Sequence, residues 1–551
     1  MILSLLIGII FAYRYIGVEL ANPNSVQDDF RQSFFWMWQY YDDSFLQNDF
    51  YAEMYKSHIV RLPILNIILK TVASLKIDLL AFSKYFSLVI GILSSLVSYL
   101  FISTVSKNKA LNIAFTVFIS FVFYCTDHIS AAQARSFIWL GLMLYMYFKN
   151  SDKNISAALT TFILLFISPN TFLLCLGMEG FAWLMESVKL KQIAVKSQSL
   201  ISSALNAVAA AVLYKVIFKD IQTQGVGTPF TKSELMNLPE FNPGGRHPIF
   251  GSHFWDGTWF RNEHWGFGYG YLEISNLVFI GLAAVVVYFV LRAILKEHNE
   301  KLYSLSLLAL SSISLYFASQ VLFPLLYLPS RYIAVPTMIL AVLFIFLALE
   351  KLTSFFANNL EDVLELSEEK KQKFSFIVFV ILASIFSGVF IFNEKKYIHL
   401  RYVSMNENIA KAFAAIPKDA LVAGYPVLPD LNSASIITRR SVYADYERAM
   451  AYTQESLAQI RHRQMVSIAM TFAKTKEEFL TLAQKEGITH FLALLDLYSP
   501  QFLNSVHYLE PYNGFLKKTI NNSGGEFFLK NYLLEHKQRY ALLDIETLTA
   551  G

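Results

Sequence analysis

Long apolar stretches dominate the first 392 residues of the chain, and short polar segments separate most of them. Roughly 20 apolar residues in a helix cross the hydrocarbon core of a bilayer. The candidate stretches lie near residues 2–20, 79–104, 111–125, 136–149, 155–168, 171–188, 199–218, 272–292, 302–323, 332–349 and 374–392. This pattern predicts a mainly α protein, a polytopic transmembrane helical bundle of about eleven spans.

Lysine and arginine gather in alternate short loops between these stretches. On one side the loops contain Lys107 and Lys109, then Lys149 and Lys153, then Lys189, Lys191 and Lys196, then Arg292, Lys296 and Lys301. On the other side the short loops contain only Arg135 and Arg331. Because loops rich in Lys and Arg stay in the cytoplasm, we expect the N-terminus inside and residues 393–551 outside.

Three segments are too polar to span a membrane. Outer loops at 21–78 and 219–271 interrupt a transmembrane domain of residues 1–392, and residues 393–551 form an extracytoplasmic domain. In that last domain Ala420–Gly424 and Ile488–Leu495 have the pattern of buried strands, and Lys474–Lys485 reads as a helix leading into the second one. Residues 446–473 have a helical composition as well. A small α/β domain with a parallel sheet is therefore predicted.

The composition excludes some classes of function. The chain is 55% hydrophobic and only 16% charged, which is typical of membrane proteins. No run of Lys and Arg is long enough to follow a phosphate backbone, so no nucleic-acid partner is expected. The two cysteines, Cys125 and Cys175, fall in or beside apolar stretches and suggest no disulfide framework.

The first outer loop begins with an acidic pair, Asp28 and Asp29. Apolar residues at positions 30, 34, 37, 38, 41 and 45 follow with helical spacing, which predicts an aromatic helix along the membrane surface. One carboxylate of the pair would act as the N-cap of that helix, and the other would face the bundle. Asp49, later in the loop, is a secondary candidate for the site.

Other outer turns contain groups with chemical potential. Asp127 and His128 are adjacent and could ligate a divalent cation or polarise a hydroxyl, or form a polar turn facing water. Arg331 could bind a phosphate at the headgroup level or act as an interface anchor. In the C-terminal domain Arg439, Arg440 and Glu447 form the notable polar cluster, interpreted as a solvated face.

The second outer loop contains three histidines, His247, His253 and His264. Their spacing matches neither the i, i+4 nor the His-x-His pattern of a metal site. The three histidines could form a metal site, but an aromatic, glycine-rich loop that folds over a sugar or a lipid headgroup fits the segment as well.

The spans themselves hold few ionisable residues, with Glu179 the clearest one. An ion-coupled transporter needs such groups at mid-membrane. The charges at the outer surface favour an enzyme there. A flippase or transporter for lipid-linked glycans and a non-catalytic membrane scaffold are the alternatives.

Taken together, the acidic pair after the first span, the second acid in the next outer loop and the outer C-terminal domain resemble the GT-C class of membrane glycosyltransferases. The segment from Asp29 to Tyr51 carries most of the likeness, which is greatest to the bacterial branch of that class. The resemblance implies a polyprenyl-phosphate-linked sugar as donor, a lipid or glycan acceptor, and the bacterial cytoplasmic (inner) membrane as the location.

The resemblance also implies roles for single residues. Asp29 or Asp28 would be the general base, and Arg331 would hold the phosphate leaving group. Supporting or substrate-binding roles fall to Asp127, His128, Asp49, Arg31 and His264. Many members of the class are thought to work without a metal, so no cofactor is certain, and a divalent cation shared by Asp127 is possible. The outer domain lacks the Trp-Trp-Asp segment of oligosaccharyltransferases, so transfer to a peptide sequon is not expected.

Overall fold

The structure is a computed structural model. It describes residues 1–47, 49–59, 63–190, 204–209, 211–212, 215, 228, 230–246, 274–294, 302–322, 326, 328–364, 367–398, 400–449 and 453–550. The chain divides into two compact units. The first, here the helical unit, comprises Met1–Leu20, Lys84–Tyr214 and Ser252–Arg401, and the second, the mixed unit, comprises Ala21–Ser83, Lys215–Gly251 and Tyr402–Gly551.

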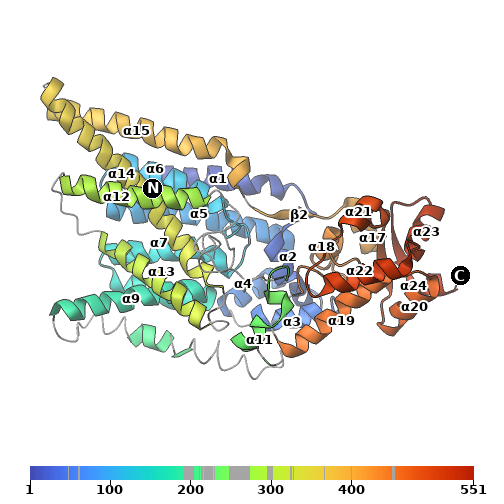
Figure 1. Ribbon diagram of the computed structural model, residues 1–551. Coiled ribbons are helices and arrows are strands. Elements are labelled where there is room, and N and C mark those ends of the chain that lie inside the picture. Colours follow the sequence, from blue (N-terminus) through green and yellow to red (C-terminus); the bar gives the residue numbers. More distant parts are fainter. Residues whose placement is uncertain are drawn as a thin grey trace. The chain divides into compact units, whose positions relative to one another are not determined.

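Within its described residues, the helical unit is built mainly of helices (Figure 1). They include α1 (Ile2–Leu20), α5 (Leu79–Val105), α6 (Lys109–Tyr124), η2 (Ala134–Ser136), α7 (Phe137–Asn150), α8 (Asn154–Ile167), α9 (Pro169–Leu190), α12 (Ile274–Ile294), α13 (Tyr303–Val321), α14 (Ser330–Leu364), α15 (Glu368–Phe392) and α16 (Glu394–Tyr397).

Most of the predicted apolar stretches are confirmed as helices. The stretch at 199–218 lies largely outside the described residues. Among the helices described, six are long and apolar enough to cross a membrane, namely α1, α5, α9, α13, α14 and α15. The mainly α class is thus confirmed and the apolar helices indicate a multi-pass membrane protein, while the count of eleven spans and their orientation stay predictions.

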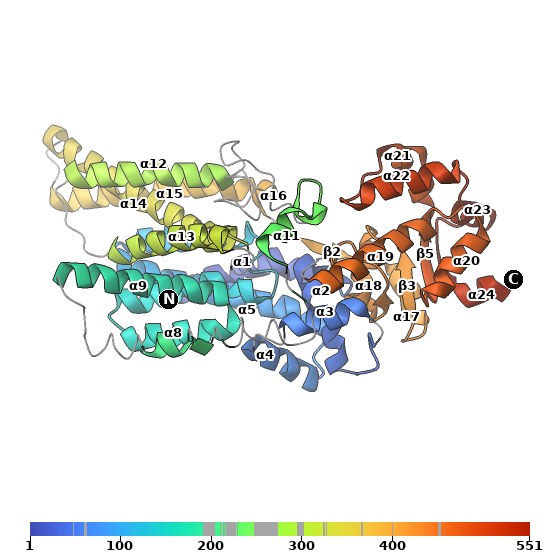
Figure 2. The ribbon, with the colours of Figure 1, turned by 60° about the horizontal axis from the view of Figure 1, so that its bottom comes forward.

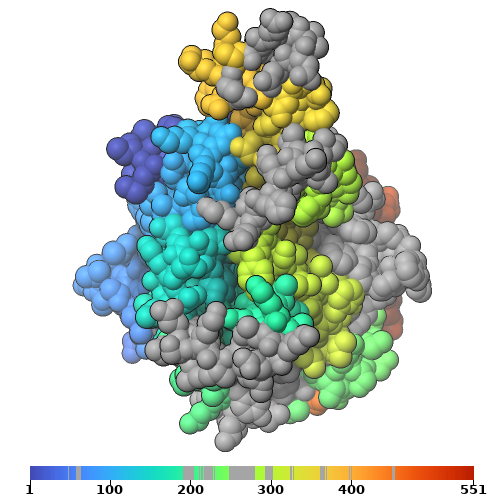
Figure 3. Space-filling model, turned by 90° about the vertical axis from the view of Figure 1, so that its left-hand side faces the viewer, coloured from blue at the N-terminus to red at the C-terminus, as the bar shows by residue number. Residues whose placement is uncertain are grey.

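Burial separates a central helix from a peripheral one in this unit. In the most apolar 18-residue window of α14, 83% of the residues are buried, against 17% in that of α15. The exposed side chains of α15 are large and apolar, Phe376, Ile377 and Ile385 among them, as expected of a helix that faces lipid. Figure 3 shows the yellow surface of α14 and α15 at one edge of the unit.

Close packing against α14 depends on a glycine. The helix α12 runs along α14, and a Cβ atom at Gly281 would overlap Ala341 of α14.

Glu179, the clearest acid in the spans, is ion-paired with Lys149 at 2.9 Å and accepts a hydrogen bond from the Tyr145 hydroxyl at 2.8 Å. This partly buried carboxylate, with partners on α7, joins helices α7 and α9.

The mixed unit contains short helices and two small sheets. Its elements are β1 (Ser25–Gln27), α2 (Asp28–Phe34), η1 (Phe35–Tyr40), α3 (Phe50–Ile59), α4 (Pro63–Ser74), α11 (Lys232–Met236), η4 (Pro239–Phe241), β2 (Tyr402–Ser404), α17 (Glu407–Ala415), β3 (Leu421–Gly424), α18 (Pro429–Thr438), β4 (Ser441–Val442), α19 (Gln454–Thr471), α20 (Lys476–Lys485), β5 (His490–Leu494), η7 (Leu495–Tyr498), α21 (Pro500–Ser505), α22 (Tyr512–Ser523), α23 (Phe528–Glu535), β6 (Tyr540–Asp544) and α24 (Ile545–Ala550).

The larger sheet has the strand order β4-β3-β5-β6. Strand β3 pairs in parallel with β4 and β5, and β6 is antiparallel to β5. Helix α19 packs on β3, and α23 on β5 (Figure 2). The two predicted strands and the helix before the second one are confirmed as β3, β5 and α20, whereas β4 and β6 were not predicted. The helix predicted from residue 446 starts at Gln454.

The first outer loop folds into the mixed unit. Strand β1 pairs with β2, with Val26 opposite Val403. The aromatic face of the loop is buried: Phe30 and Phe34 are 0% exposed, and the Trp38 indole donates a hydrogen bond to the Ile436 carbonyl at 2.8 Å. The predicted helical spacing is confirmed by α2 and η1, but the prediction that this aromatic face lies in the headgroup layer is wrong, because these side chains fill a protein core instead.

Candidate functional site

The acidic pair occupies the first turn of α2. Gln27, not an aspartate, is the N-cap, since its side-chain oxygen accepts a hydrogen bond from the Phe30 N–H at 3.0 Å. Asp28 and Asp29 follow as the first two helical residues, where negative charge interacts well with the helix dipole. The prediction that one of the two carboxylates is the N-cap is wrong. Capping by Gln27 leaves both carboxylates for other roles.

Asp28 belongs to a partly buried group of four charges. Its Oδ1 accepts a hydrogen bond from Arg31 Nε at 2.8 Å and is ion-paired with Arg31 Nη2 at 2.7 Å. Arg31 Nη2 lies 3.9 Å from Glu447, and Arg246 forms a short ion pair with the same Glu447. We call Asp28, Arg31, Arg246 and Glu447 the four-charge cluster. Two carboxylates and two guanidinium groups balance one another in it.

The cluster is held rigidly by its surroundings. Arg31 is 5% exposed, and its Nη1 also donates to the Ser433 hydroxyl at 3.2 Å. Burial raises the pKa of Glu447, and the nearby Arg246 guanidinium opposes this effect. Charge-assisted hydrogen bonds of this kind fix the direction of a side chain. The first turn of α2 is thereby anchored to the C-terminal part of the mixed unit.

Asp29 has a different environment from its neighbour. The Gln27 side-chain amide donates to Asp29 Oδ2 at 3.3 Å, so the N-cap residue contacts this second carboxylate too. The two aspartates therefore have different partners: Arg31 is hydrogen-bonded to Asp28, and Gln27 is hydrogen-bonded to Asp29.

Asp49, the secondary candidate in the same loop, has a structural role. Its Oδ1 accepts the Ala52 N–H at 2.9 Å in the first turn of α3, and its Oδ2 accepts the Val442 N–H of β4 at 3.1 Å. The residue is 1% exposed, and burial raises its pKa against the opposing effects of Arg448 and the two N–H donors. It joins the first loop to the sheet and offers no open carboxylate face.

Asp127 and His128 lie in the helical unit, in the turn after α6. Asp127 Oδ2 is ion-paired with Arg135 at 3.1 Å and with Arg401 at 3.4 Å. The His128 ring contacts the Thr126 hydroxyl at 2.9 Å, and its carbonyl accepts a hydrogen bond from Ser136. Two guanidinium groups on one carboxylate oxygen compete with any cation for it. This donor set does not fit a divalent metal ion.

No metal centre is found elsewhere in the part of the chain that the structure describes. There, no three His, Cys, Asp or Glu side chains gather in a way that could hold an ion. His247, His253 and His264 lie outside the described residues, so the predictions for them, including the supporting role of His264, stay predictions.

Arg331 lies in the first turn of α14. Its backbone N–H donates to the Leu328 carbonyl at 3.0 Å. Its guanidinium group makes no ion pair with a described residue. The predicted role of this cation in binding a phosphate stays a prediction.

Some residues of the site escaped the sequence interpretation. Glu447 is not part of a solvated face, because it contacts Arg31 and Arg246, which lie about 400 and about 200 residues away in the sequence. The pairs Asp28/Arg31 and Asp445/Arg448 have i, i+3 spacing, a local signal that could have indicated ion pairs. Nothing local could have indicated Arg246 or Arg401.

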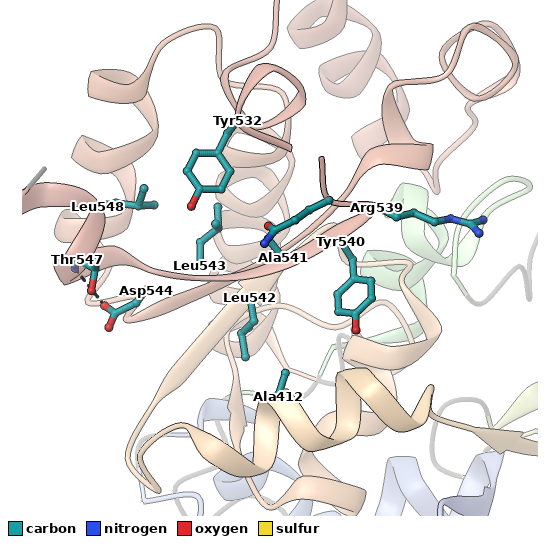
Figure 4. A pocket seen from close by; sticks show the side chains of 11 residues that line it. Ala412, Tyr532, Arg539, Tyr540, Ala541, Leu542, Leu543, Asp544, Thr547 and Leu548 are labelled. Atoms are coloured by element: carbon teal, nitrogen blue, oxygen red, sulfur yellow. Dashed lines mark hydrogen bonds between the residues drawn. The ribbon is translucent and has the colours of Figure 1, made fainter. Parts of the chain in front are cut away.

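The cavity at strand β6 is a weaker candidate. It measures about 550 Å³ and is lined largely by β6 and its flanking residues. Figure 4 shows Tyr540 and Leu542 pointing toward Ala412 of α17, and Leu543 toward Tyr532. Asp544 Oδ1 accepts the Glu546 N–H at 2.9 Å at the start of α24. Its one carboxylate thus serves a helix terminus, and the cavity holds no cluster for catalysis.

Comparison with known proteins gives structural similarities only. No protein-family model matches the chain, and no curated protein matches it in sequence. Solved structures of the oligosaccharyltransferase AglB from Archaeoglobus fulgidus are similar over 94% of this chain and 72% of that chain. The complex with an inhibitory peptide and a dolichol-phosphate has 11% identity and a TM-score of 0.47. The apo form has 10% identity and a TM-score of 0.48. At this level the likeness assigns neither a family nor a function to this chain.

Proposed function

We propose that the chain is a membrane glycosyltransferase of the GT-C type, which moves a sugar from a polyprenyl-phosphate donor to a lipid or glycan acceptor outside the cytoplasm. The observation that carries the proposal is the acidic pair directly after the first apolar helix, with Asp28 fixed by Arg31 in the four-charge cluster. Charged side chains that are partly buried and held close together by one another are candidates for a functional site.

Asp29 is the proposed general base. Oδ1 of Asp28 already accepts a hydrogen bond from Arg31 Nε and is ion-paired with Arg31 Nη2, which suits a positioning role for Asp28. Asp29 would take the proton of the acceptor hydroxyl while the hydroxyl oxygen attacks the anomeric carbon. The bond between that carbon and the phosphate oxygen then breaks, and polyprenyl phosphate leaves.

Arg331 is the proposed partner of the leaving phosphate. Its guanidinium group makes no ion pair among the described residues, and a planar fork of N–H donors matches a phosphate. No step of the proposed reaction is assigned to a metal ion.

The test is transfer of radiolabelled sugar from polyprenyl-phosphate donors by the purified full chain, with membrane lipids and glycans as acceptors. We expect Asp29→Asn to lower the rate by about 10² or more, the usual contribution of a general base. Asp28→Asn should lower the rate less, because Arg31 loses its partner while the base remains. Asp43→Asn, at an exposed aspartate in the same loop, is the matched control.

The same assay separates the alternatives. A flippase would move the labelled lipid across the membrane without forming a labelled acceptor, and a scaffold would do neither. Wild-type rates in both Asp28→Asn and Asp29→Asn would refute the carboxylate mechanism.

A further inference from the structure

A basic cavity in the mixed unit takes no part in the proposed reaction. It measures about 520 Å³ and lies between helix α17, the end of helix α18 and the first outer loop. The charged residues of its lining are Lys411, Lys418, Arg439, Arg440 and Glu407. The lining thus contains four cationic side chains and one carboxylate. The volume of the cavity is within the range of small-molecule sites.

Two of these four cations are neutralised by nearby carboxylates. Lys411 forms an ion pair with Glu407 at 2.7 Å, and Lys418 pairs with Asp42 at 3.0 Å. Both lysines are more than half exposed, so these ion pairs are weak, and another anion could replace the carboxylate in each pair. The excess charge of the cavity therefore comes from its two arginines.

Arg440 is a buried cation without a carboxylate among the described residues. Its guanidinium donates to backbone carbonyls only: to Thr438 at 3.0 Å, to Ala414 at 3.1 Å, and twice to Ile416, at 3.1 and 2.7 Å. Burial lowers its pKa, and the neighbouring Arg439 lowers it further. An anion in the cavity would offset both effects.

Arg439 is positioned by aromatic stacking. Its guanidinium carbon lies 4.1 Å from the ring centroid of Trp38 and 5.5 Å from that of Phe45. It makes no hydrogen bond or ion pair with a described residue, so the edge of its planar fork can still donate. Stacking holds the fork in one plane at a low entropic cost.

The backbone at Arg439 is unusual as well. Arg439 follows α18 in the left-handed region, with φ of 63°. Helices that end in this way most often have glycine there, because a side chain adds strain. An arginine that bears this strain and lines a cavity indicates a role for its side chain.

We propose that this cavity is a binding site for a phosphate group, with Arg439 donating in a bidentate manner and Arg440 adding fixed positive charge. The phosphate could belong to a soluble phosphate ester or to an anionic lipid headgroup, since both present the same oxygens. The cavity shares no residue with the four-charge cluster. A result that rules out phosphate binding in this cavity would therefore leave the proposed glycosyl transfer unaffected.

The experiment is calorimetric titration of the purified full chain in neutral detergent at low ionic strength. The soluble probes are inorganic phosphate and glycerol phosphate. The lipid probe is a short-chain phosphatidylglycerol, with short-chain phosphatidylcholine as the zwitterionic control. Arg439→Asn removes the fork while keeping a residue that tolerates the left-handed backbone. Lys518→Gln, at an exposed lysine of α22, is the matched loss of one charge.

We expect the wild type to bind a phosphate probe more weakly as salt is added. Arg439→Asn should weaken binding about tenfold or more, as for the loss of a charge-assisted hydrogen-bond pair. Lys518→Gln should bind as the wild type does. Binding of the soluble probes alone supports a soluble ester, and binding of phosphatidylglycerol alone supports a lipid headgroup.

Two results would overturn the proposal. One is the absence of binding by every phosphate probe. The other is equal affinity of the wild type and a folded Arg439→Asn variant. Thermal unfolding of each variant shows whether it is folded, and because the asparagine suits the backbone at this position, we expect little loss of stability.

Discussion

At the scale of single residues, burial decides what a charge does in this protein. Asp445 is 0% and Arg448 1% exposed, and their side chains meet at 2.7 Å. The Arg448 guanidinium also lies 4.1 Å from the ring centroid of Phe35. One buried arginine thus links the first loop to the C-terminal part of the mixed unit. The exposed pair Arg539–Asp496, at 2.9 Å, has similar geometry in water.

We predict that Asp445→Asn destabilises the mixed unit by about 3 kcal/mol or more, because a buried guanidinium loses the carboxylate with which it is ion-paired. The equivalent change in the exposed pair, Asp496→Asn, should cost less than about 1 kcal/mol. The shift in the thermal unfolding midpoint of the full chain measures both. Equal shifts for the two variants would contradict this interpretation of the buried pair.

At the scale of elements, the pairing of β1 with β2 sets the path of the first loop. The Met405 N–H donates to the Asn24 carbonyl, so residues 24 and 405 form a hydrogen-bonded pair. The next pair, Ser25 and Ser404, is then of the non-hydrogen-bonded type, with Cα atoms about 4.5 Å apart. That separation suits a disulfide.

We therefore expect Ser25→Cys with Ser404→Cys to form a disulfide on mild oxidation, seen as the loss of two titratable thiols. The natural cysteines, Cys125 and Cys175, are buried and should not interfere. The control pair, Ser25→Cys with Val403→Cys, places the two sulfurs on opposite faces of the ribbon and should remain reduced. Efficient oxidation of the control pair would show that the register is wrong.

The sequence predicted elements where the signal is local. Length and hydropathy were sufficient for the long helices of the helical unit, and apolar runs were sufficient for β3 and β5. Strand β4 has only two residues, and β6 alternates buried and partly exposed side chains, so neither has a strong apolar run. The aromatic loop was misjudged because a face that packs on protein has the same spacing as one that lies on lipid.

In the candidate site, too, the residues that could be predicted from the sequence are those that lie close together along the chain. The acidic pair and its Arg31 partner lie within one helical turn, and all three residues were named as candidates from the sequence, although the ion pair between Asp28 and Arg31 was not predicted. The partners Glu447 and Arg246 come from distant segments, and the assignment of Gln27 as N-cap depends on the exact helix start. Interactions of that kind require the fold.

At the scale of the whole molecule, the distribution of Lys and Arg predicts the sidedness of the membrane protein. We expect a cysteine placed at the exposed Lys485 to react with a membrane-impermeant maleimide in intact spheroplasts. A cysteine at the exposed Lys153 should react only after lysis. The reverse pattern would invert the orientation and move the acidic pair to the cytoplasmic side.

The pairing of Val26 with Val403 also has a consequence for the order of synthesis. The two partners are separated by 377 residues, from 403 minus 26, so at about 5 to 20 residues per second the first waits roughly 20 to 75 s for the second. During that interval the aromatic side chains of the first loop have no C-terminal core to fill. The exposed aromatic segment could aggregate during this interval. We expect a chaperone on the outer side of the membrane, or the lipid surface, to cover it until translation ends.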